Sequence, residues 1–279
     1  MVSPPRRPGV PPPRRPGVWP LWLIGALCVL PEVCLQLADA GLIGSANWRH
    51  RAYQYGGFWS GLLRNWRANY AFQPEAMFLS YAWLHAGFGH LLGNMATLIW
   101  VGRALLGTLS PRRFIALYLA SAVGGALAFG MMTEGRAPMV GASGALFGLA
   151  GAWVALDWRA CARPRARGGL GRRRGTLRTA GFVAGLVALN LAVWWVQGGI
   201  LAWQAHLGGS LTGAALVLAM GVPRRPPAPL VDPSDGPNGF DGAGDPGNDA
   251  DGARPRSGTG GDTDARIDPS TKAGGRPPA

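Results

Sequence analysis

Six apolar runs, each about 20 residues long, constrain the fold of this chain more than any other feature of its sequence. They lie at about 18 to 40, 87 to 109, 113 to 133, 143 to 158, 178 to 198 and 202 to 222, the fourth being the shortest. A helix of about 20 residues crosses a hydrocarbon core about 30 Å thick. Because lipid offers the backbone no hydrogen bonds, such runs cross it as helices. The sequence therefore predicts an all-α, polytopic membrane protein with six transmembrane helices.

Two polar tails flank this predicted helical domain, residues 18–222. Residues 1–17 are rich in proline and arginine, and residues 223–279 are rich in glycine, proline and aspartate. Neither composition buries enough apolar surface to fold alone. We expect both tails to be disordered.

The placement of arginine indicates how the chain is oriented. The formal net charge is +13, and arginines cluster in the first tail, after the second and fourth runs, and after the sixth run. Cytoplasmic loops retain Arg and Lys, so both termini are expected in the cytoplasm. Anionic lipid head groups explain the basic excess better than nucleic acid does. The Arg-rich, Ala- and Gly-rich composition favours a bacterial plasma membrane. An organellar membrane is the alternative, because the acid-free, Arg-rich start is similar to a transit peptide.

The first connection, residues 41–85, is the exception to this charge rule. It is expected outside, yet it holds four arginines, Arg49, Arg51, Arg64 and Arg67. Many aromatic residues lie among them, as in segments that rest in the membrane interface. Such a segment either binds substrate or braces the bundle. Glu32, which follows Pro31 inside the first run, has no role that the sequence assigns.

Polar side chains within apolar runs need a partner, a wet cavity or a function. His85, His90 and Asn94 stand just before and within the second run. His90 and Asn94 are four residues apart, so they share one face of a helix. Structural, metal-binding and catalytic roles are all open for this cluster alone. Three cysteines, at positions 28, 34 and 161, have no zinc or redox spacing.

Ser143 opens the fourth run between Gly141-Ala142 and Gly144. Small neighbours leave its hydroxyl unshielded at a helix N-terminus, where free N–H groups can stabilise an oxyanion. The soluble hydrolase pattern G-x-S-x-G fails, because Ala145 replaces its last glycine. Alone, Ser143 is also compatible with a helix cap.

His206 lies in the first half of the last run and completes the set of reactive groups. Gly209 and Gly213 follow it at G-x-x-x-G spacing, and Gly144 and Gly148 repeat that spacing after the serine. Such steps let helix backbones approach closely, which would bring Ser143 within reach of His206. With donors on a third helix, these groups form the parts of an acyl-transfer site. No carboxylate is obviously placed as a third member, so the sequence predicts a Ser-His dyad.

These motifs resemble the rhomboid family of intramembrane serine proteases, in its six-helix bacterial form. The resemblance rests on H-x-x-x-x-H-x-x-x-N from His85 to Asn94, G-x-S-G from Gly141 to Gly144, and A-H-x-x-G-x-x-x-G from Ala205 to Gly213. It covers about residues 18 to 222. In one departure, the family often has a Trp-Arg pair where this chain has Ala76-Met77.

The resemblance implies a role for each motif residue. Ser143 would be the nucleophile and His206 the general base, while His90 and Asn94 would form the oxyanion hole with the Ser143 N–H. The supporting residues would be His85, Gly141, Gly144, Gly209 and Gly213. It implies an endopeptidase that cleaves transmembrane segments of membrane proteins without a cofactor or metal. The alternative is a non-catalytic rhomboid-like client-binding protein or chaperone; a transporter is disfavoured because no inverted repeat is evident.

Overall fold

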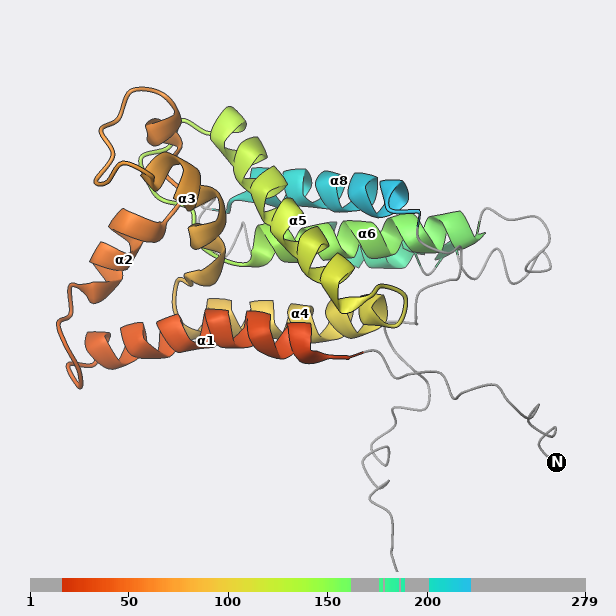
Figure 1. Ribbon diagram of the computed structural model, residues 1–279, viewed down its shortest axis with the longest axis horizontal. Coiled ribbons are helices and arrows are strands. Elements are labelled where there is room, and N and C mark those ends of the chain that lie inside the picture. Colours follow the sequence, from red (N-terminus) through yellow and green to blue (C-terminus); the bar gives the residue numbers. More distant parts are fainter. Residues whose placement is uncertain (1–16, 162–175, 178, 186, 189–200, 222–279) are drawn as a thin grey trace, which may run out of the picture. The chain divides into compact units, whose positions relative to one another are not determined.

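The computed structural model describes residues 17–161, 176–177, 179–185, 187–188 and 201–221 (Figure 1). Over these ranges it is helical, with one isolated β-bridge between Phe58 and Met139. Both predicted tails and most of the fifth run lie outside the described residues. The pieces of that run that are described are helical.

The other five predicted runs all form long helices. They are α1 (Trp19–Asp39), α4 (Phe88–Leu106), α5 (Pro111–Met132), α6 (Ser143–Cys161) and α8 (Trp203–Ala219). Prolines in the first turns of α1 and α5 explain where those helices begin, because their missing N–H has no partner there anyway. All-helical architecture is therefore as the apolar runs predict.

Only α1 and α5, among the described helices, are both long and apolar enough to cross a membrane by length and composition alone. The structure shows the reason: α8 has 17 residues, and α4 and α6 carry glycines, polar groups and an arginine within their length. Large apolar side chains nevertheless face outward, including Trp22, Leu92 and Met131. Outward apolar surface of this extent suits a lipid environment.

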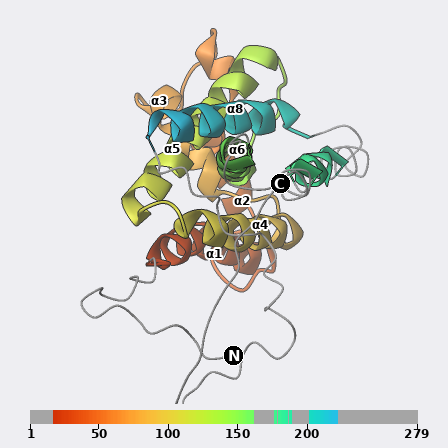
Figure 2. The same cartoon turned by 90° about the vertical axis from the view of Figure 1, so that its right-hand side faces the viewer.

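Three helices, α5, α6 and α8, pack against one another (Figures 1 and 2). A Cβ placed on Gly208 of α8 would lie 2.6 Å from the carbonyl oxygen of Gly124 on α5. One on Gly151 of α6 would lie 2.2 Å from the carbonyl oxygen of Ser210 on α8. The helix backbones thus touch directly, as small residues at such spacings permit.

The first connection folds against one end of this bundle. It contains α2 (Trp48–Gly56), the short 3₁₀ turns η1 (Ser60–Leu63) and η2 (Tyr81–Trp83), and α3 (Gln73–Ser80) between them. Phe58 is fully buried, edge-on to Phe78, Tyr81 and Phe129. Its backbone pairs with Met139, just before α6. The connection therefore braces the bundle near the start of α6.

Two of the four arginines in this connection are paired with acids. Arg49 binds Glu32 at 2.9 Å and Asp39 at 2.6 Å, while Arg64 lies 3.9 Å from Glu134. Glu32 is 1 % exposed, so its charge needs such a partner. The structure thus gives Glu32 the partner that the sequence could not identify.

Candidate active site

Ser143 is the first residue of α6, and the backbone before it is held in an unusual conformation. Gly141 has φ of 126°, a region that side chains with a Cβ rarely adopt. Its N–H donates to the carbonyl of Tyr81, 2.9 Å away. A Cβ there would also lie 2.9 Å from Nε2 of His90. Glycine is therefore required at position 141 by both conformation and space.

His206 lies on α8 with its Nε2 2.9 Å from Oγ of Ser143. The two helices approach closely enough because of their glycines. A Cβ on Gly209 would lie 1.9 Å from the carbonyl oxygen of Gly144, and one on Gly213 would lie 1.9 Å from that of Gly148. The structure thus brings together the serine and histidine that the two G-x-x-x-G steps were expected to join.

Phe147 is a site residue that the sequence did not identify. Its ring lies flat against the His206 imidazole, with centroids 4.2 Å apart and planes 8° from parallel. It follows Ser143 by four residues, so both side chains stand on the face of α6 that meets α8. This i, i+4 spacing from Ser143 was the sequence signal that could have identified Phe147 as a site residue. The stacking restricts rotation of the His206 imidazole, for which the sequence predicted no orienting carboxylate.

His90 and Asn94 present nitrogen donors beside Gly141. Nδ1 of His90 accepts a hydrogen bond from the Ala86 N–H at 3.3 Å, so the neutral ring carries its proton on Nε2. The Cβ position of Gly141 is 2.9 Å from that Nε2 and 3.7 Å from Nδ2 of Asn94. Asn94 Nδ2 is buried and meets no acceptor among the described residues. Both donors are thus available next to the peptide that leads into Ser143.

His85 is fully buried behind this pair. Its ring is edge-on to that of His90, with centroids 5.3 Å apart. Burial first, and the neighbouring His90 second, lower the pKa of His85 from 6.5 to about 4. A neutral ring packed against His90 agrees with a supporting position rather than direct contact with a reacting group.

A family model for the Rhomboid domain matches residues 72–222. The chain therefore belongs to the rhomboid family, and its helices form a polytopic membrane bundle. The matched range begins within the first connection, just before α3, and includes α4, α5, α6 and α8. All the site residues named above lie within it.

Curated relatives carry the same family name. The chain is 38% identical over 140 residues to RHOMBOID-like protein 1 of Arabidopsis thaliana, covering 48% of this chain and 31% of that protein. It is 31% identical over 144 residues to Rhomboid protease GluP of Bacillus subtilis (strain 168), covering 50% and 25%. A third, Inactive RHOMBOID-like protein 8 of Arabidopsis thaliana, is 34% identical over 83 residues, covering 29% and 23%.

The chain matches less than half of the length of each of these relatives. Their names include both a protease and an inactive protein, so a likeness to them shows the family and leaves the activity of this chain to be argued from its own residues.

Proposed function

We propose that this protein is an intramembrane serine endopeptidase that cleaves transmembrane segments of membrane proteins. The observation that carries the proposal is the 2.9 Å contact between Oγ of Ser143 and Nε2 of His206. A nucleophile within hydrogen-bond reach of a base is the arrangement that activates a hydroxyl. The family contains a protein named as a protease, which supports the same reading.

The reaction follows from the positions of these two side chains. Nε2 of neutral His206 accepts the Ser143 proton while Oγ attacks the peptide carbonyl. The imidazolium then protonates the departing amine, leaving an ester on Ser143 that water hydrolyses with His206 again as the base. Stacking on Phe147 holds the ring in plane through both steps.

The tetrahedral intermediate places a negative oxygen near the N-terminus of α6. The N–H of Ser143, Nε2–H of His90 and Nδ2 of Asn94 are its proposed donors. Preorganised donors stabilise such a charge without reorganisation of solvent. No cofactor or metal enters this mechanism.

The substrate class follows from the environment of the site. A peptide carbonyl within a transmembrane helix is already hydrogen-bonded, so a cleavable segment must unwind before it reaches Ser143. Helix-breaking residues and small side chains near the scissile bond favour that unwinding. We therefore propose transmembrane proteins as partners within the bilayer, and no nucleic acid.

The proposed location is a bacterial plasma membrane with both termini in the cytoplasm. Under this orientation the starts of α4, α6 and α8, and therefore the site, lie toward the external side. The arginines of the first tail and of the connections after α4 and α6 support this orientation.

The test uses purified full-length protein in detergent, a fluorophosphonate probe and a reporter transmembrane substrate. Wild type should label and cleave, while Ser143→Ala and His206→Ala should do neither, with unchanged thermal melting. Wild type that captures the reporter without labelling or cleavage would instead establish the client-binding alternative. Labelling that persists in Ser143→Ala would contradict the assigned nucleophile.

A further inference from the structure

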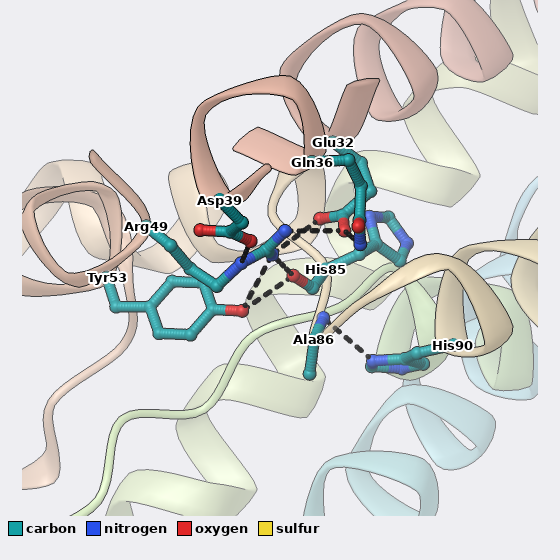
Figure 3. Close-up of polar contacts among 8 residues, drawn as sticks. All are labelled: Glu32, Gln36, Asp39, Arg49, Tyr53, His85, Ala86 and His90. Carbon is teal, nitrogen blue, oxygen red and sulfur yellow. Dashed lines mark hydrogen bonds and ion pairs between the residues drawn. The ribbon is translucent and has the colours of Figure 1, made fainter. Parts of the chain in front are cut away.

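Arg49 makes the densest set of polar contacts around the approach to α4 (Figure 3). Its Nη1 and Nη2 bind the two oxygens of Glu32 at 2.9 and 3.0 Å, and its Nε binds Asp39. Gln36 donates to the same Glu32 carboxylate at 2.8 Å. The guanidinium is thereby fixed at the end of α1 by two acids.

The same guanidinium also forms a hydrogen bond with the backbone carbonyl of His85. Nη1 of Arg49 donates to the His85 carbonyl oxygen at 3.0 Å, and the hydroxyl of Tyr53 donates to that oxygen at 2.7 Å. Nη1 further contacts the Tyr53 oxygen at 3.3 Å. One carbonyl thus receives two donors from α2, one of them charged.

The His85 carbonyl and the Ala86 N–H belong to one peptide unit. That unit is planar, so fixing the direction of its C=O fixes the direction of its N–H. The Ala86 N–H donates to Nδ1 of His90 at 3.3 Å, as Figure 3 shows. A charged donor on the carbonyl also polarises the peptide and strengthens the N–H as a donor.

We infer that Arg49, held by Glu32 and assisted by Tyr53, is a positioning residue for His90. The contacts run from Arg49 through the His85–Ala86 peptide to Nδ1 of His90. They keep the neutral His90 proton on Nε2, which faces Gly141 and the start of α6. Arg49 touches no reacting group itself. The consequence for turnover rests on the proposed function, whereas the consequence for the His90 tautomer does not.

Two variants separate positioning from folding. Tyr53→Phe removes one donor from the His85 carbonyl and leaves the Arg49–Glu32 pair in place. Arg49→Lys keeps a positive charge for Glu32 but loses the planar fork that reaches two acids and a carbonyl at once. Arg51→Lys is the matched control, because Arg51 lies on the same helix and is exposed.

The first measurement is the ¹⁵N spectrum of histidine-labelled protein in detergent. Wild-type His90 should show a single Nε2–H tautomer, and both Tyr53→Phe and Arg49→Lys should convert it to a mixture, while Arg51→Lys should not. This readout needs no catalysis. If wild type proves inactive but the tautomer responds in this way, the positioning role stands and the proposed function fails.

The second measurement is kinetic. A misplaced donor near a reacting group costs up to about a hundredfold, and we expect kcat to fall about tenfold in each variant with KM unchanged. In a His90→Ala background the same substitutions should cause no further fall, because their effect passes through His90. An unchanged His90 tautomer in both variants, or an equal fall in kcat with and without His90, would overturn the inference.

Discussion

Nε2 of His206 lies 2.9 Å from Oγ of Ser143, although 63 residues separate them in the chain. Packed helices ordinarily lie with their axes about 8 to 10 Å apart, and glycines at the contact let two helix backbones touch. The contact depends on the places where α8 lies directly against the backbone of α6. A single carbon atom added at those places should therefore change the distance between Ser143 and His206.

Gly209→Ala should separate α6 from α8 and abolish labelling of Ser143. The added Cβ would lie 1.9 Å from the backbone oxygen of Gly144, which cannot rotate away. Overpacking of this kind costs about 1–3 kcal/mol, so the melting temperature in detergent should fall as well. Gly93→Ala on α4 is the control, because a Cβ there meets nothing within 4 Å. Equal melting temperatures and labelling rates for the two variants would contradict the close approach.

Phe147→Ala should lower kcat about tenfold with little change in KM, because a freely rotating imidazole spends less time aligned with Ser143. The ring contact at 4.2 Å and 8° is the physical basis. Phe147→Tyr keeps the aromatic face and should retain most of the activity. Steady-state cleavage of the reporter substrate measures both variants. If the alanine and tyrosine variants turn over at the same rate, the stacking has no role in orienting His206.

Asn94→Ala should slow turnover while the protein stays folded. Removal of one oxyanion donor costs about 2.7–4 kcal/mol, or roughly a hundredfold to a thousandfold in kcat. Nδ2 of Asn94 meets no acceptor among the described residues, so its loss breaks no hydrogen bond of that amide nitrogen there. Parallel measurements of kcat and of thermal melting separate the two effects. Wild-type turnover by the purified variant would remove Asn94 from the proposed oxyanion hole.

The sequence predicted those features that depend on local pattern. Helix positions follow from apolar length, and the five predicted runs that the structure describes agree with its helices within a few residues. The meeting of Ser143 and His206 was predicted because glycine spacing reports which helix faces approach. The reactive roles of these residues stay predictions.

What the sequence could not predict depends on tertiary contacts in the first connection. Arg49 lies 17 residues from Glu32 and 36 from His85, and no local pattern links such positions. In the sequence, Arg49 was only one of four arginines in a connection that the placement of arginine elsewhere predicts to be external. The Gly141 N–H donates to the backbone carbonyl of Tyr81. A contact between two backbones does not depend on side-chain type, so the sequence does not indicate it. The family's Trp-Arg pair gave no guidance, because this chain has Ala76-Met77 in its place. The arginine that contacts the His85 carbonyl is Arg49, which lies on α2.

His85 should make the stability of the protein depend on pH between about 4 and 6.5. Burial lowers its pKa from 6.5 to about 4, so below pH 6.5 the unfolded chain takes up a proton that the folded chain does not. Stability is then complete above pH 6.5 and is lost as the pH falls toward 4, by up to about 3 kcal/mol from this residue. Thermal melting in detergent at pH 7 and pH 4.5 measures the loss. His85→Gln should show a smaller difference between the two pH values than wild type, whereas the exposed His50→Gln should match wild type. An identical pH dependence in all three proteins would mean that His85 is protonated in the folded state.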